Sequence, residues 1–306
     1  MATSNVEHLA GAATTGMSKK RGLSRITPQS RWYWVRILLE NPVAVASLIL
    51  LTLLVLVSIF APLIAPYDPR FLDPVNRLQP PSSTNWLGTD DSGRDLLSRI
   101  LYGGRVSLLI GITVTVAAAI FGTLLGLAAG YYDRLDSWIM RAMDGLMAFP
   151  SILLAIAIMV SLGAGARNVW IALVIVYTPT IARLVRSSTL VLRQQAYVES
   201  ARSIGLGNGS ILIKYIFPNS LSPLIVQCTF VIAFSIIAEA SLSFLGAGVD
   251  PQTPTWGNML RDGQRMMQIA WWSAIFPGLA LVILVLSLNL LGDALRDALD
   301  PRVRER

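Results

Sequence analysis

The stretch "VAVASLILLTLLVLVSIFAPLIA", residues 43–65, contains no charged residue, and its only polar side chains are Ser and Thr hydroxyls. A hydrocarbon core of about 30 Å requires roughly 20 apolar residues in a helix, so this stretch is long enough to cross a bilayer. Its apolar core and its basic leader are both too long for a signal peptide. We therefore expect a membrane-spanning helix here rather than a cleaved leader.

Five further apolar runs follow this one, over residues 106–130, 138–162, 169–185, 221–245 and 270–291. The runs are continuous and lack the period-two alternation of barrel strands. The composition agrees, because only 14% of the residues are charged, against about a quarter in soluble domains. The mean hydropathy is +0.58. The sequence thus predicts an all-α integral membrane protein with six transmembrane helices.

The Lys and Arg residues indicate the orientation of these helices. With the N-terminus in the cytoplasm, most of the 25 Lys and Arg residues fall in cytoplasmic segments, as positively charged loops usually do. We therefore expect both termini to be cytoplasmic. The cations are spread over four segments, so anionic lipid is the expected partner of the net +7 charge, and no nucleic acid is expected.

The segment "YVESARSIGLGNGSILIKYIFPNS", residues 197–220, separates the fourth and fifth runs and is cytoplasmic in this orientation. Residues 194–204 lack a helix breaker and predict a short helix. Its periodicity places Val198, Ala201 and Arg202 on one side and Glu199 and Ser203 on another.

A bend and a second helix are expected to follow. Gly205 and Gly207 can adopt positive φ and end the first helix. Asn208 or Ser210 is expected to cap a second helix over residues 211–217, which Pro218 should stop. Residues 194–218 then form a projecting elbow, which either docks another protein or is a surface helix without a partner.

This elbow resembles the coupling motif of permease subunits in ATP-binding-cassette importers, which reads Glu-Ala-Ala, three residues, Gly, nine residues, Ile-x-Leu-Pro. Mild departures are Ser200 for Ala, Tyr215 for Ile and Phe217 for Leu. The resemblance implies an interface with an ATPase subunit, and it assigns to this interface Glu199, Ser200, Ala201, Gly205, Gly207 and Pro218.

Longer stretches resemble the second permease of dipeptide, oligopeptide and nickel importers, namely residues 85–112, 241–260 and 286–302. Residues 182–205 are similar to the dipeptide and glutathione branch. The resemblance implies a type I importer permease fold in a bacterial inner membrane. It also implies a second homologous permease subunit, two cytoplasmic ATP-binding subunits and an extracytoplasmic solute-binding protein. Dipeptides, oligopeptides, glutathione and nickel chelates all remain open as the solute.

The residue types argue against catalysis by this chain. The phosphate-binding pattern G-x-x-x-x-G-K-[ST] is absent from the sequence. A single histidine, His8, and a single cysteine, Cys228, provide neither a Cys/His metal site nor a disulfide. We expect no cofactor and no enzymatic site.

Two polar residues within the apolar runs are candidates for a pore or a structural role. Glu239 lies in the fifth run, where an acid should face protein or water. It either lines the pore, where it would meet the amine of a peptide, or has a structural partner such as an arginine of the outer loops, and we favour the structural role. Asn289, in the sixth run, is the second candidate.

Other features of the runs predict local structure. Arg141 and Asp144, three residues apart, are expected to pair. Pro150 and Pro179 should kink the third and fourth spans.

The chain divides into a disordered basic leader (1–30), an amphipathic segment with the first span (31–66), an outer loop (67–103), a permease core (104–292) and a cytoplasmic tail (293–306). In the outer loop, Asp90 or Asp91 is expected to cap a short interfacial helix containing Leu96. Trp271 and Trp272 should lie in an aromatic belt.

Two rival classes remain at this stage. An ion-coupled transporter should carry coupled intramembrane acids or matching broken helices in two repeats, and the sequence has one intramembrane acid and no visible repeat. A membrane scaffold would use the elbow to recruit cytoplasmic enzymes without transporting anything.

Overall fold

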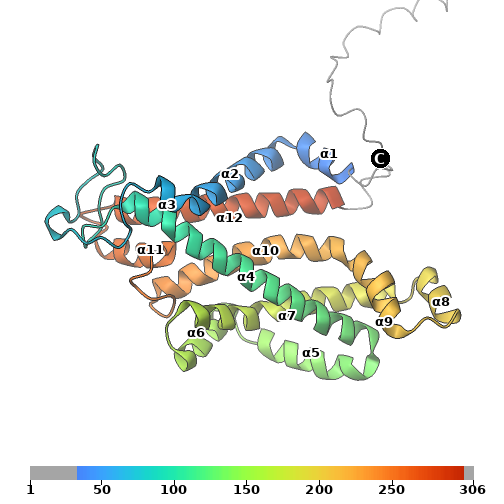
Figure 1. The fold of residues 1–306 in the computed structure, drawn as a ribbon. Coiled ribbons are helices and arrows are strands. Elements are labelled where there is room, and N and C mark those ends of the chain that lie inside the picture. The colour runs from blue at the N-terminus through green and yellow to red at the C-terminus, as the bar shows by residue number, and fades with distance from the viewer. Residues whose placement is uncertain (1–32, 300–306) are drawn as a thin grey trace, which may run out of the picture.

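The computed structural model describes residues 33–299, which form an all-helical bundle (Figure 1). The helices, in chain order, are α1 (Tyr33–Glu40), α2 (Pro42–Ile59), α3 (Ala61–Ile64), η1 (Pro74–Asn76), α4 (Leu96–Tyr131), α5 (Asp133–Met147), α6 (Ser151–Leu162), α7 (Ala166–Leu192), α8 (Ala196–Ser203), α9 (Asn208–Ile211), η2 (Leu212–Ile216), α10 (Phe217–Phe244), α11 (Trp256–Arg265) and α12 (Trp272–Leu299).

The number of predicted spans is confirmed. Within the described residues, five helical stretches are long and apolar enough to cross a membrane, and a bent pair of helices makes a sixth. The five contain α2, α4, α7, α10 and α12. The bent pair is α5 and α6.

The third predicted span is not one straight helix, because α5 and α6 meet at 90°. Pro150 lies between them and is the residue before α6 begins. Proline has no N–H to donate and disfavours helical backbone in the preceding residue, so the first helix ends there. The charged residues of α5 add a second reason, since this helix is unsuited to face lipid along its whole length.

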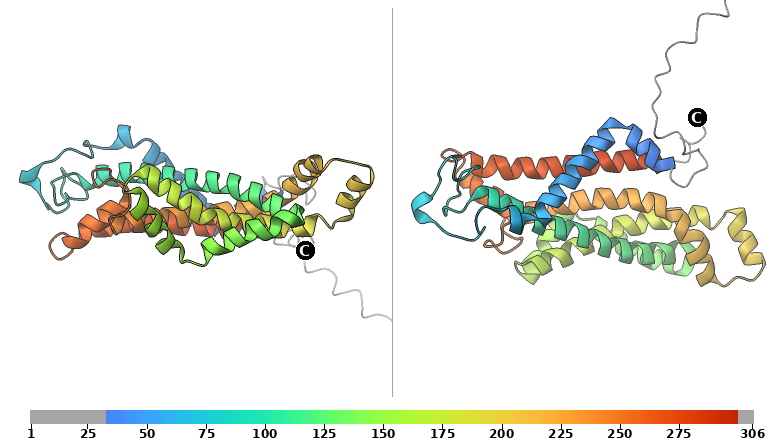
Figure 2. Two further views of the ribbon diagram at one scale, coloured as in Figure 1. Left: turned by 90° about the horizontal axis from the view of Figure 1, so that it is seen from below. Right: turned by 45° about the horizontal axis from the view of Figure 1, so that its top comes forward.

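The ends of the bundle agree with the expected orientation. Helix α1 and the C-terminal end of α12 lie at the same end as α8 and α9, and the outer loop and α11 lie at the opposite end (Figure 1). The elbow projects beyond the neighbouring helices in both further views (Figure 2). The predicted leader and residues 300–306 of the predicted tail lie outside the described residues, and the proposed domain limits stay predictions.

Helices α4 and α7 pack closely through glycines on α4. A Cβ on Gly122 would lie 2.7 Å from Cβ of Ile181, and one on Gly126 would lie 2.6 Å from the backbone oxygen of Ala182. Gly130 repeats the pattern one turn further along, where Thr189 is the neighbour. Small residues four apart let the backbones of membrane helices approach, so this stripe sets the α4–α7 distance.

The outer loop does not contain the separate interfacial helix that the sequence predicted. The residues expected to form it are the first turns of α4, which continues to Tyr131. The cap is Asp95, whose Oδ2 accepts from the Ser98 backbone N–H at 2.8 Å. Asp90 instead accepts from Nε of Arg94 at 2.6 Å. The prediction of Asp90 or Asp91 as the cap was therefore wrong.

The two tryptophans at the start of α12, Trp271 just before it and Trp272 as its first residue, differ in their surroundings. Trp271 is 52% exposed, which suits an aromatic belt, whereas Trp272 is 6% exposed. The Trp272 Nε1–H donates to the backbone oxygen of Thr89 at 3.2 Å. Trp272 therefore fastens the outer loop to the start of α12, and the aromatic belt stays a prediction for Trp271.

Candidate functional site

The first half of the elbow is helix α8. Val198 and Ala201 are buried, at 0% and 3% exposure, and lie in one hydrophobic cluster with Ile211 and Ile216. Glu199 and the neighbouring Ser200 are exposed on the other side of the helix. The predicted division of α8 into an apolar and a polar face is confirmed for these residues. Arg202, expected on the apolar side, is exposed.

Gly205 ends α8 as predicted, with φ +81°. The Gly205 N–H donates to the Arg202 oxygen at 3.0 Å, and the Leu206 N–H donates to the Ala201 oxygen at 3.2 Å. This pair of bonds is the Schellman motif of helix C-termini. Gly207 has φ −65° and is the N-cap residue of α9, so the prediction of positive φ there was wrong.

The second half of the elbow is not a separate helix. Helix α9 passes through the π-helical turn η2 directly into α10, and Pro218 lies in the first turn of α10. Phe217, the last residue able to donate before the proline, bonds to the oxygen of Leu212, five residues back. Pro218 itself needs no donor in a first turn. The expected stop at Pro218 was therefore wrong.

The elbow is fixed to the end of α4. The Tyr131 hydroxyl donates to Oδ1 of Asn208 at 2.8 Å, so Asn208 serves this contact rather than the predicted cap. The Arg202 guanidinium lies 5.8 Å from the Tyr131 ring centroid. Tyr131 also packs against the buried cluster of the elbow. The sequence did not point to Tyr131, because its partners lie far along the chain and only the fold brings them together.

Within the described residues, three ion pairs join α5 to α7 or to Arg193, the residue that follows α7. Asp144 pairs with Arg183 at 2.7 Å, and Asp133 pairs with Nη1 of Arg193 at 2.8 Å. Between them, Nη2 of Arg186 donates to Oδ2 of Asp136 at 2.6 Å. We call these pairs the α5–α7 ladder. Helix α5 lies in the half of the bundle that carries the elbow (Figure 1).

The ladder replaces a pair that the sequence predicted. Arg141 was expected to pair with Asp144 on the same helix, but Asp144 faces Arg183, and the Arg141 guanidinium lies 5.7 Å from the Trp138 ring centroid. The fold places α7 beside α5, and Arg183 of α7 is therefore the partner of Asp144. Residue spacing along α5 alone does not predict this pair.

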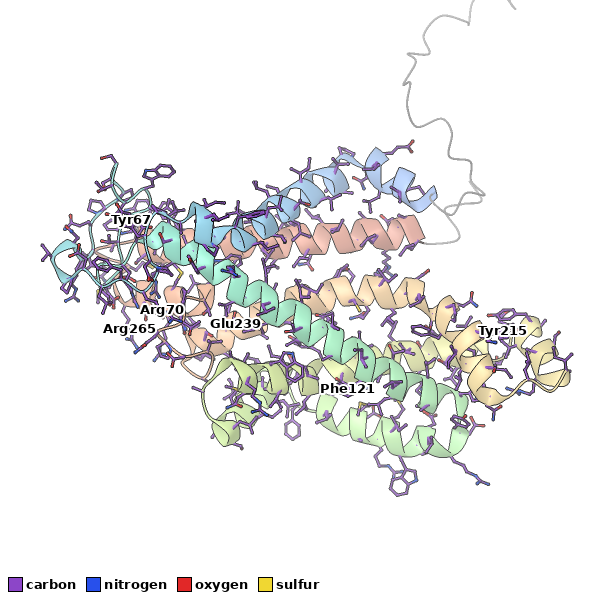
Figure 3. The ribbon with its side chains drawn as sticks, in the orientation of Figure 1. Tyr67, Arg70, Phe121, Tyr215, Glu239 and Arg265 are labelled. Carbon is purple, nitrogen blue, oxygen red and sulfur yellow. The ribbon has the colours of Figure 1, made fainter. Side chains whose placement is uncertain are left out.

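Glu239 belongs to the part of α10 that lies nearer the outer end of the bundle (Figure 3). It is 0% exposed. The Ser107 hydroxyl donates to Oε2 and the Ser243 hydroxyl donates to Oε1, each at 2.9 Å. Thr255, the N-cap residue of α11, is also fully buried. The partners of the carboxyl group are thus hydroxyls from α4 and α10, and not the arginine that the sequence suggested as an example. Asn289 is half-buried on α12.

The chain matches known proteins over nearly its whole length. Residues 118–305 match the family described as binding-protein-dependent transport system inner membrane component. Residues 30–81 match the N-terminal transmembrane domain of oligopeptide transport permease C.

Individual relatives agree with these family matches. The dipeptide transport system permease protein DppC of Alkalihalophilus pseudofirmus is 46% identical, over 87% of this chain and 88% of the relative. The glutathione transport system permease protein GsiD of Pectobacterium atrosepticum is 48% identical, over 90% and 91%. A putative peptide transport system permease protein of Brucella suis is 48% identical, over 84% and 87%. The chain therefore belongs to the family of multi-pass inner-membrane permeases of binding-protein-dependent transport systems.

Proposed function

We propose that this chain is the permease subunit of an ATP-driven importer for dipeptides, oligopeptides or a related small solute such as glutathione or a nickel chelate. The family implies a solute-binding protein and ATPase partners in general terms. The names of the relatives, which are dipeptide, peptide and glutathione permeases, support the solute class. Nickel chelates rest on the sequence resemblance alone.

The assembly that we propose contains two permeases. This chain pairs side by side with a second homologous permease in the lipid bilayer, and two ATP-binding subunits sit below, one on each elbow. A binding protein delivers the solute from the opposite side. Alternating access then needs only two arrangements of the helices with different pore-wall contacts, and the chain supplies no covalent chemistry.

The observation that carries the coupling role is the exposed face of α8 at the cytoplasmic end. Glu199 and Ser200 lie on this face, and Ile204 next to them is 78% exposed. Burial of this apolar side chain against another protein would remove it from water, which favours association. We propose that these side chains contact the ATPase, while the buried Ala201 positions α8 and Gly205 sets the bend.

The path from the elbow into the membrane is short. Motion of α8 would reach α4 through the hydrophobic cluster and Tyr131. It would reach α10 through η2, which continues without a break into the first turn of α10 at Pro218. Gly207, as the N-cap residue of α9, keeps this second connection compact. For Glu239 we propose a structural role that joins α4 and α10, and for Asn289 a place beside the pore.

Co-purification tests this function. The tagged chain, expressed with its partner subunits, should bring down a second permease and an ATPase pair, and reconstituted vesicles should take up dipeptide only with ATP and binding protein. Ile204→Asp and Glu199→Lys should lose the ATPase and keep the second permease. Arg134→Glu, an exposed charge reversal on α5 outside the elbow, is the matched control. Neither partner should appear if the chain is an ion-coupled transporter or a scaffold.

A further inference from the structure

Two cavities lie along one face of α10. One, of about 380 Å³, is bordered by α5, α6, α7 and α10 and includes Tyr177 and Thr180. The other, of about 680 Å³, lies where α10 borders α12 and α7, towards the elbow end. Gln227 lines both cavities, so they are neighbours along α10, and we call the two together the groove.

The residues of α10 that line the groove lie at helical spacing along this helix. On α10 the lining residues run from Asn219 through Val226 and Phe230 to Phe234, at helical spacing. This stretch is about 22 Å long at about 1.5 Å per residue. That is close to the length of six extended residues at about 3.3 Å each. The groove is therefore long enough for a short peptide in an extended conformation.

Polar side chains in the groove are available to a ligand. Within residues 33–299, the side chains of Thr180, Ser222 and Gln227 make no hydrogen bond. All three belong to helices that span the membrane, where a polar group facing lipid is unfavourable. A surface that only packed against acyl chains would be apolar. These hydroxyl and amide groups match the N–H and C=O groups of a peptide.

The charged side chain that lines the groove is positive. Among the described residues, Arg296 is the one ionisable Asp, Glu, Lys or Arg side chain that lines either cavity. It lies on the last turn of α12, at the cytoplasmic end. Its neighbours Asp293 and Asp297 do not line the groove. An arginine guanidinium binds carboxylates by charge-assisted hydrogen bonds, whereas it repels cations.

We propose that this groove is the solute-binding path on this chain, and that Arg296 receives the C-terminal carboxylate of a short peptide as it moves towards the cytoplasm. Gln227, Thr180 and Ser222 bind the peptide amides above it. The proposal rests on the proposed import function, and it adds the binding surface and the chemical group that this surface selects. A carboxylate-bearing solute fits the groove, and a cationic one does not.

Uptake by the complete reconstituted importer tests the role of Arg296. A free-acid dipeptide and its C-terminal amide are compared with the same binding protein throughout, so that any change in their ratio arises in the membrane complex. Arg296→Gln should lower the ratio of acid to amide uptake about 10-fold, since a hydrogen bond to a charged group contributes roughly that much. Arg296→Lys, which keeps the positive charge, should retain most of the wild-type ratio of acid to amide uptake. Arg134→Gln, an exposed cation at the same end but outside the groove, is the control and should leave the ratio unchanged.

Photolabelling with a dipeptide that carries a diazirine side chain tests the groove itself. During ATP-driven uptake, the label should fall on peptides that contain residues 177–184 and 219–234, and excess unlabelled dipeptide should suppress it. An unchanged acid-to-amide ratio in Arg296→Gln, or labelling confined to other helices, would overturn the groove while import by the wild type continued. Absence of any wild-type uptake would instead overturn the proposed function.

Discussion

The bend at Gly205 offers the sharpest test of the coupling elbow. Gly205 has φ +81°, and a Cβ added there would meet no atom of the described residues within 4 Å. Substitution therefore causes backbone strain without a steric clash. A left-handed conformation costs an L-residue about 1–2 kcal/mol, and more when the side chain is β-branched. Gly205→Val should thus reduce the population of the native bend relative to an opened one by roughly 5–30-fold.

The assay compares ATP hydrolysis with solute uptake in vesicles that contain the complete importer and its binding protein. Gly205→Val should keep the protein in the membrane and permit ATP hydrolysis while reducing uptake, because the elbow no longer transmits motion. Gly205→Asn should resemble the wild type, since Asn tolerates positive φ. Gly209→Ala is the matched control, as it lies in the same segment, has open space around it and lacks positive φ. Normal coupling in Gly205→Val, or an equal defect in Gly209→Ala, would refute the reasoning.

Three further predictions concern packing and buried carboxyl groups. Gly126→Leu should destabilise the α4–α7 contact by about 1–3 kcal/mol or prevent folding, because its Cβ would meet the Ala182 oxygen at 2.6 Å. Thermal unfolding in detergent measures the effect, and Gly145→Leu, at a position with open space, is the control. Glu239→Leu should destabilise the complex by about 1–3 kcal/mol, because buried hydroxyls lose their acceptor, whereas Glu239→Gln should retain assembly as judged by gel filtration. Burial is the main cause that raises the pKa of Asp262 above its ordinary 3.8, and the negative charge of Asp91 is the second, so the folded state binds this proton more tightly than the unfolded state. The free energy of unfolding should therefore fall as the pH rises from 3.8 through the raised pKa. Asp262→Asn should remove this pH dependence from thermal unfolding curves.

Hydropathy predicted the spans because crossing a bilayer is a property of the local sequence. The elbow was predicted for a similar reason, since the facing of Val198 and Ala201 and the positive φ of Gly205 depend on neighbours within a few residues. Gly207 shows the limit of this reasoning, because two glycines in one segment can each end a helix and the sequence does not distinguish them.

The errors arose where distant segments meet. The partner of Asp144 is on another helix, and the acceptor for Trp272 lies in the outer loop. One hydroxyl partner of Glu239, Ser107, lies 132 residues away on α4, and no local pattern relates the two. The passage of the chain through Pro218 depends on a π-helical turn, which propensities do not predict. For the same reason, Tyr131 was missed as the anchor of the elbow.

The α5–α7 ladder also bears on how the protein is made. An unpaired Asp near the middle of a helix opposes insertion by about 3 kcal/mol on the translocon scale, so α5 with its acidic residues is a poor substrate for insertion alone. The arginines that pair with these acids come later in the chain, in α7 or just after it: Arg183, Arg186 and Arg193. We expect the third and fourth spans to leave the translocon together as a neutralised hairpin. In nascent chains arrested after Leu162, α5 and α6 should therefore remain accessible to added protease, and in chains extended past Arg193 they should be protected. Equal protection at both lengths would show that α5 enters the membrane unaided.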